Sequence, residues 1–404
     1  MAARNLPEDP LIRRLVIEAR RAQLSRRALL TGVGGGAAAL SLTACAGGTG
    51  TELKPAEDKS ASDKTVNWVN WPLYLDEDES GNHPTLQQFE DETGIKVNYS
   101  VDVDDNNIYY GKVKDQLALG QDIKADTVVL TEWMVSRWIR LGYTQELNHD
   151  NIPNMKNLNP ALADPDYDPG RKRTMPWQGG FAGICWNKEK VPNGLRSVSD
   201  LWNPELKGRV GVLSEMRDTM GLLMLEQGVD ISGDWGAEEF GKALDVLREQ
   251  VSSGQIRNVK GNSYSEDLAN EDTLAAICWS GDITILNAEA GEEKWEFAIP
   301  DAGCTLWNDL FLVPIGSPRK TNAEKLINFY YEPEIAAEVA AWVNYISPVV
   351  GAREAAVAID PALAENQLIF PSDETLAKAH TFRTLDSGEE QEFGAEFQSI
   401  LLGA

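Results

Sequence analysis

The stretches TVNWVNW (residues 65–71) and DTVVLTEW (residues 126–133) decide the fold of this 404-residue chain. Each has the apolar side chains of a short β-strand, ends in a tryptophan and precedes a segment with helical spacing. The order strand, helix, strand, helix predicts an α/β fold with a parallel sheet covered by helices on both faces. The strands and helices expected here are Thr65–Trp71, Thr85–Glu92, Ile95–Val101, Ile108–Leu119, Asp126–Leu130 and Glu132–Leu141.

The same alternation continues after residues 148–173, which are rich in Pro, Asp and Asn and are therefore expected to form a loop. By length alone, the chain corresponds to about two domains. The further strands expected are Phe181–Asn187, Val210–Leu213, Ala275–Trp279, Trp295–Ile299 and Leu310–Val313. The further helices expected are Val198–Trp202, Thr219–Glu226, Ala237–Val251, Ile283–Glu289, Ala323–Tyr330, Pro333–Asn344 and Glu390–Leu401.

The start of the chain has the pattern of a bacterial export signal. Ser25-Arg26-Arg27 precedes the apolar stretch Ala28–Ala44, which closes on Leu42-Thr43-Ala44-Cys45. The twin arginine predicts a Tat-type signal over residues 1–44, and the last four residues predict cleavage before Cys45 and lipidation of this cysteine. An uncleaved membrane anchor is the alternative, although a span needs about 20 strongly apolar residues. Either reading places the rest of the chain outside the cytoplasmic membrane, and residues 45–64 are expected to be a lipidated, flexible tether.

The composition argues against a nucleic-acid partner, a histidine-based catalytic site and a metal site. The predicted signal holds seven of the 37 basic residues and three of the 63 acidic residues, so the predicted mature chain has a net charge near −30. Such a surface repels nucleic acid and attracts cations. The three scattered histidines give no catalytic constellation, and we expect no cofactor. A calcium loop starting at Asp102 lacks the glycine and the glutamate that it would need, so we also expect no metal.

Besides Cys45, the chain has three cysteines with no C-x-x-C spacing and no nearby histidine, which argues against a zinc site. Cys278 lies in an apolar stretch and is expected to be a buried free thiol. A disulfide between Cys185 and Cys304 remains open, because the sequence does not give connectivity. If the Tat route is used, the chain folds in the reducing cytoplasm, and its stability should not depend on such a bridge.

Four segments place an aromatic residue beside an acid or a hydroxyl at the end of an expected strand. In a parallel sheet, ligands bind outside the carboxyl ends of the strands. A single tryptophan is more often part of a core, but four such segments in an acidic chain favour a ligand cleft. They are Asn70–Tyr74, Thr131–Trp133, Trp279–Asp282 and Leu306–Asp309.

With these segments, residues 65–404 resemble the periplasmic spermidine/putrescine-binding proteins, the substrate receptors of polyamine ABC importers. The resemblance rests on Val66–Trp71, Asp126–Trp133, Leu201–Gly208, Trp279–Gly281, Trp307–Asp309 and Leu312–Pro314. It implies a two-lobed periplasmic-binding-protein fold of type II with two crossing hinge strands, near residues 181–186 and 302–307. The implied lobes comprise residues 65–180 with 307–355, and residues 181–306 with 356–404.

The family's pocket also implies a role for ten residues of this chain. Trp71 and Tyr74 would line the cleft, Thr131 and Trp133 would replace a serine and a tyrosine, and Glu215 and Asp218 would receive one ammonium. Trp279 and Trp307 would flank the methylene chain, Asp309 would hold an amine, and Tyr345 would close the pocket. Pro72 departs from the family pattern, and the family's late glutamine has no clear match, since the nearest candidate is Arg383.

The resemblance therefore implies a monomeric polyamine receptor that closes around its ligand and docks on a membrane permease. Acids and aromatic faces suit this ligand class, because ammonium groups bind carboxylates and aromatic rings while methylenes pack on apolar walls. Two alternatives stay open. The same fold could bind an amino acid, an opine, a sugar or an iron complex, or the chain could be a secreted hydrolase that uses paired carboxylates.

Overall fold

The computed structural model describes residues 53–401 and shows one continuous mixed sheet in the order β2-β1-β3-β9-β4-β7-β5-β6. Strand β10 pairs with β9, and β8 pairs with β4. The predicted export signal and Cys45 lie outside the described residues. The strands are Thr65–Asn70 (β1), Lys96–Val101 (β2), Thr127–Thr131 (β3), Thr174–Asn187 (β4), Val210–Leu213 (β5), Ile256–Lys260 (β6), Ala275–Trp279 (β7), Trp295–Ala298 (β8), Cys304–Leu312 (β9) and Ala379–His380 (β10).

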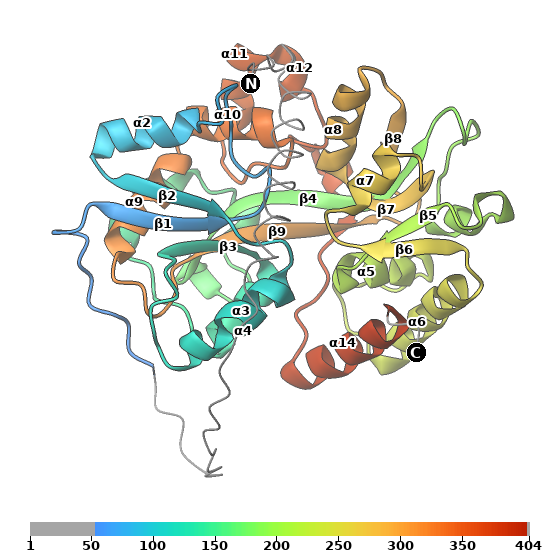
Figure 1. Ribbon diagram of the computed structural model, residues 1–404, viewed down its shortest axis with the longest axis horizontal. Coiled ribbons are helices and arrows are strands. Elements are labelled where there is room, and N and C mark those ends of the chain that lie inside the picture. Colours follow the sequence, from blue (N-terminus) through green and yellow to red (C-terminus); the bar gives the residue numbers. More distant parts are fainter. Residues whose placement is uncertain (1–52, 402–404) are drawn as a thin grey trace, which may run out of the picture.

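Helices cover both faces of this sheet, as the order of elements predicts (Figure 1). Short 3-10 turns fill the chain before β4 and before β5. No helix among residues 53–401 combines the length and the apolar character needed to cross a membrane. The helices are Pro84–Thr93 (α2), Asn106–Ala118 (α3), Glu132–Arg140 (α4), Met216–Glu226 (α5), Ala237–Ser252 (α6), Tyr264–Ala269 (α7), Ser280–Ala290 (α8), Lys320–Tyr330 (α9), Pro333–Val343 (α10), Ala352–Ile359 (α11), Pro361–Ala364 (α12), Asp373–Leu376 (α13) and Ser387–Leu401 (α14).

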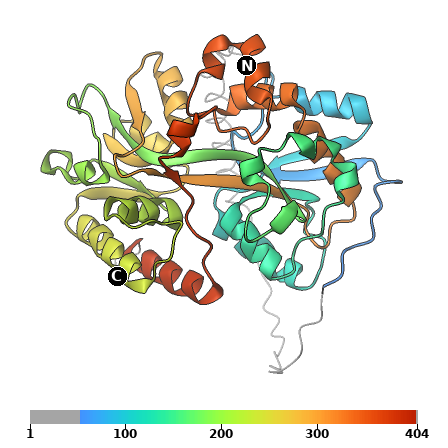
Figure 2. The ribbon, with the colours of Figure 1, turned by 180° about the vertical axis from the view of Figure 1, so that it is seen from behind.

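Two antiparallel strands, β4 and β9, run through the centre of the molecule and join its two halves (Figures 1 and 2). On one side, β3 pairs with β9, with Thr131 opposite Asp309. On the other side, β7 pairs with β4, with Trp279 opposite Ala182. The parallel strands β2, β1 and β3 form the first lobe, and the parallel strands β7, β5 and β6 form the second. The predicted α/β fold with two lobes and two crossing strands is therefore confirmed.

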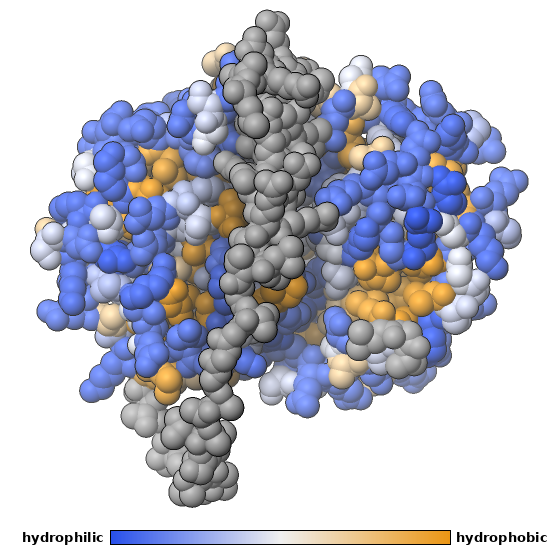
Figure 3. Space-filling model, viewed as in Figure 1, coloured by the Kyte–Doolittle hydropathy of each residue, from blue (hydrophilic) through white to orange (hydrophobic). Residues whose placement is uncertain are grey.

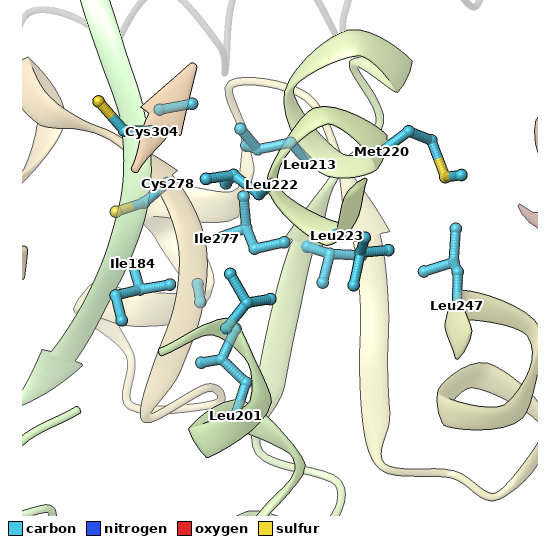
Figure 4. Close-up of a cluster of buried hydrophobic side chains, with 14 of the residues drawn as sticks. Ile184, Leu201, Leu213, Met220, Leu222, Leu223, Leu247, Ile277, Cys278 and Cys304 are labelled. Atoms are coloured by element: carbon cyan, nitrogen blue, oxygen red, sulfur yellow. The ribbon is translucent and has the colours of Figure 1, made fainter. Parts of the chain in front are cut away.

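Each lobe has its own hydrophobic core. In the first, Trp68 and Trp138 lie at the centres of two clusters, one on each face of the sheet. In the second, leucines, isoleucines and methionines of α5, α6 and the strands pack with Cys278 and Cys304 (Figure 4). Ala356 and Ala364 pack in the first lobe although the sequence predicts its end at residue 355, and the chain enters the second lobe later, at β10 and α14.

The segment before β1 is bound to the first lobe. The backbone N–H of Ala56 donates to the carbonyl of Ile315 at 3.0 Å, and that of Lys59 donates to the carbonyl of Pro318 at 2.7 Å. Arg319 pairs with Asp63 at 2.9 Å. The prediction of a flexible tether is therefore wrong for residues 53–64. Hydrogen bonds and an ion pair hold this segment on the first lobe, and its sequence, which has few apolar residues, does not indicate such contacts.

The three cysteines described are buried free thiols, so the candidate bridge between Cys185 and Cys304 is not present. Instead, Cys185 lies beside Cys278, across the pairing of β4 with β7. Burial raises the pKa of Cys304 to about 12, which keeps this thiol protonated and unreactive. The expectation that Cys278 is a buried free thiol is confirmed.

Candidate ligand site between the lobes

A cavity of about 1010 Å³ lies between the lobes, where the parallel strands of both halves end. Trp71 follows β1, Thr131 ends β3, Glu215 follows β5 and Trp279 ends β7. Each lobe therefore contributes the carboxyl edge of its sheet, which is where open α/β sheets bind ligands. The ten residues proposed from the sequence all line this cavity: Trp71, Tyr74, Thr131, Trp133, Glu215, Asp218, Trp279, Trp307, Asp309 and Tyr345.

Asp309 is the carboxylate on the crossing strand β9. Its side chain is 5% exposed, and the Tyr74 hydroxyl donates to its Oδ2 at 2.7 Å. Among the described residues, its Oδ1 has no hydrogen-bond partner. Burial raises the pKa of Asp309 to about 6, against the lowering effects of Thr131 and Tyr74. A buried acceptor without a partner is costly, so this oxygen is suited to a donor that arrives with a ligand.

Asp218 is held in a different way, on the first turn of α5. The Trp279 indole N–H donates to Oδ2 at 2.8 Å, and the Thr305 hydroxyl donates to Oδ1 at 2.6 Å. Burial raises the pKa of this carboxyl, although both hydrogen bonds oppose the shift. Asp218 therefore fixes the Trp279 ring at the cavity wall and keeps a negative charge near it.

Glu215 caps α5 and lies beside a cation, Arg217, that is not among the ten residues expected in the site. Its carboxylate accepts from the backbone N–H of Arg217 at 3.3 Å and lies 4.0 Å from the Arg217 guanidinium. Burial raises the pKa of Glu215 to about 7, and burial also lowers the pKa of Arg217. The guanidinium lies 4.1 Å from the centre of the Trp133 ring, in a cation–π contact.

Aromatic rings form the wall near Asp309. The Tyr345 ring meets Tyr74 and Trp307 edge to face, with centroids 5.9 and 5.0 Å apart. Two glycines allow this packing. A Cβ on Gly281 would lie 2.8 Å from the Tyr345 ring, and a Cβ on Gly180 would overlap the Trp307 ring.

Three further charged residues of the cavity are additions to the predicted site: Glu132, Arg217 and Asp282. Asp282 accepts from the hydroxyls of Tyr264 at 2.9 Å and Tyr345 at 3.1 Å, so it orients the closing tyrosine. Glu132 accepts from the backbone N–H of Asn308 at 2.8 Å, and burial raises its pKa to about 8. Two of the three could have been found, because Glu132 and Asp282 lie inside the aromatic-and-acid segments that the sequence indicates.

The charge balance of the cavity favours a cation. Arg217 is the single Lys or Arg among the described residues that line it. Within residues 53–401, no cluster of His, Cys, Asp and Glu has the arrangement of a metal site. Hydrophilic residues cover most of the visible surface of both lobes, with smaller hydrophobic patches among them (Figure 3). The acidic lining residues are Glu77, Asp104, Asp105, Glu132, Glu215, Asp218, Glu266, Asp282, Glu289 and Asp309.

The family model of bacterial extracellular solute-binding proteins matches residues 85–366. The chain belongs to this family. This solute-binding protein is 29% identical to the putrescine-binding periplasmic protein PotF of Escherichia coli over 345 residues, which are 81% of this chain and 88% of PotF. It is 28% identical to the spermidine/putrescine-binding periplasmic protein 1 of Haemophilus influenzae over 345 residues, 85% of this chain and 90% of that protein.

A solved structure from Listeria monocytogenes, described as a spermidine/putrescine ABC transporter, has the same fold. Its TM-score is 0.72 at 26% identity, and the match covers 85% of this chain and all of that one, 100%. The resemblance to spermidine/putrescine-binding proteins is therefore confirmed, and with it the extracytoplasmic location that the family implies. These relatives are binding proteins of transport systems rather than enzymes.

Proposed function

We propose that this solute-binding protein captures polyamines in the cavity between its lobes and delivers them to the permease of an ABC importer. The observation that carries the proposal is the Oδ1 of Asp309, which has no hydrogen-bond partner among the described residues and lies in an acid-lined cavity with Tyr74, Trp307 and Tyr345. An ammonium there would gain a charged hydrogen bond and aromatic faces. The ligands named for PotF and for the Haemophilus protein support the same class.

The test is calorimetry with putrescine, spermidine, an amino acid and a sugar against the purified protein. We expect only the polyamines to bind. Asp309→Asn should weaken this binding by about 100-fold, because a charged hydrogen bond in a buried site contributes roughly 1.5–3 kcal/mol. Asp115→Asn, at an exposed position of α3, is the matched control and should change nothing. Binding of the sugar, unaffected by Asp309→Asn, would overturn the proposal.

We also propose that Cys45 carries a lipid and anchors the protein to the outer face of the cytoplasmic membrane as a monomer. The support is the Leu42–Cys45 pattern together with the extracellular family. The measurement is partition of the full-length protein into detergent after expression in its bacterial host. Wild type should enter the detergent phase, and Cys45→Ser should stay in the aqueous phase. Equal partition of the two proteins would contradict the anchor.

A further inference from the structure

Three carboxyl groups of the cavity form a row, Asp309, Asp218 and Glu215. Asp218 is the middle one, because it accepts from Thr305 of β9, the strand that carries Asp309, and lies in the first turn of α5, which Glu215 caps. Asp309 lies on the crossing strand and Glu215 at the start of α5, so the row runs from the hinge toward the second lobe. Three carboxylates in a row could receive a chain with up to three ammonium groups.

The three carboxylates differ in what they already bind. Asp309 has one oxygen without a partner among the described residues. Among the described residues, Asp218 accepts from the neutral donors Thr305 and Trp279 and forms no ion pair, although the charge of Arg217 opposes the rise in its pKa that burial causes. Glu215, in contrast, has the guanidinium of Arg217 beside it. The last position of the row therefore already holds a positive charge that belongs to the protein.

Other contacts hold Arg217 in this place. Its guanidinium pairs with Glu390 of α14 at 3.4 Å, and it lies over the Trp133 ring at 4.1 Å. The Arg137 guanidinium also lies over the Trp133 ring, at 5.1 Å. The Arg217 side chain is 11% exposed, so it has little room to swing into solvent. An incoming ammonium would thus find both the Glu215 carboxylate and the Trp133 ring in contact with guanidinium groups.

We propose that Arg217 determines specificity by holding the place of a third ligand ammonium, so that the cavity prefers diamines to triamines. This inference rests on the proposed polyamine function. A diamine places one ammonium at Asp309 and the other at Asp218. The additional ammonium of a triamine would lie against Arg217, where like charges repel each other in a water-poor site.

The experiment compares putrescine and spermidine by calorimetry on the wild type, Arg217→Met and Arg140→Met. The wild type should bind putrescine at least about tenfold more tightly than spermidine, a difference of about 1.4 kcal/mol. Arg217→Met keeps an unbranched, though shorter, side chain and removes its charge, so the preference for putrescine should fall by about tenfold or reverse. Arg140→Met removes another partner of Glu390 that does not line the cavity, and should leave the ratio unchanged.

Each result has a distinct meaning. Equal affinity of the wild type for the two amines, or an equal change of both in Arg217→Met, would overturn the role of Arg217. If neither putrescine nor spermidine binds, the proposed function itself is overturned. Arg217→Lys covers the case in which the methionine variant does not fold: it retains the positive charge and should retain the preference for putrescine. Loss of the preference in a folded Arg217→Lys would contradict the inference.

Discussion

At the scale of single residues, the acids of the cavity are tuned toward neutral pH. Burial raises the pKa of Asp309 to about 6 and that of Glu215 to about 7. A carboxyl with a pKa of about 6 or 7 is partly protonated near neutral pH, and a protonated carboxyl does not attract an ammonium. A bound cation favours the charged form, so an ammonium that binds at Asp309 must lower the pKa of this carboxyl and release protons.

The sign of the pH effect follows from these values. Above about pH 7, Asp309 is charged before the ligand arrives, and affinity should be highest. As the pH falls through about 6, binding must expel a proton from Asp309, and the affinity for putrescine should fall by about tenfold per unit. Calorimetry at pH 5, 6, 7 and 8, in buffers of different ionisation enthalpy, measures both affinity and proton release. A flat profile, or uptake of protons, would contradict the assignment.

At the scale of elements, the sequence predicts most strands and helices, and the exceptions have physical causes. Strand β4 begins at Thr174, seven residues before the predicted start, because Pro176 and two glycines interrupt its apolar pattern. One of these glycines, Gly180, makes room for the rings of Trp307 and Tyr345, so the packing of the site interrupts the sequence pattern of the strand. Strand β6 was not predicted, because it lies at the edge of the sheet and carries Arg257 and Lys260.

The residues of the candidate site were also predicted where local sequence patterns indicate them. Its ten predicted residues lie at strand ends or in segments matched to a family, and both are local signals. Arg217 was not predicted to matter, since its position over Trp133 depends on how α5 of one lobe meets α4 of the other. Contacts between lobes have no signature within a single stretch of sequence.

The close packing of β4 gives a prediction for this element. A Cβ at Gly180 would overlap the Trp307 ring, so Gly180→Ala should displace that ring. We expect a loss of stability of about 1–3 kcal/mol, as for other overpacked sites, together with weaker putrescine binding. Gly241→Ala is the control, because nothing lies within 4 Å of a Cβ at this position of α6. It should stabilise the helix slightly. Thermal unfolding and calorimetry measure both effects, and a Gly180→Ala protein with wild-type affinity would refute the packing argument.

At the scale of the whole molecule, one carboxylate links the two lobes on the side of α14. Glu390 pairs with Arg137 at 3.1 Å and with Arg140 at 2.8 Å, both on α4 of the first lobe. Its own helix packs on α6 of the second lobe (Figure 2). The pairs exist only while the lobes are close together, so they stabilise the closed arrangement against the open one.

Removing this link should shift the protein toward the open arrangement. Glu390→Gln should weaken the binding of any ligand by about fivefold, roughly 1 kcal/mol, and should enlarge the radius of gyration without ligand. The neighbouring Glu389→Gln is the control, because Glu389 pairs with Arg383 inside the second lobe. Small-angle X-ray scattering and calorimetry make the comparison. If both variants scatter alike, the link does not control closure.

The hydrogen bonds and the ion pair of residues 56–63 fix the segment before β1 to the first lobe. With the proposed anchor at Cys45, only residues 46–52 separate the lipidated cysteine from Leu53, and a fully extended chain of this length spans at most about 29 Å. The membrane would then hold the first lobe and leave the second free to rotate. A permease beside this receptor would then meet a second lobe that rotates when the ligand binds, while the first lobe keeps its place at the membrane.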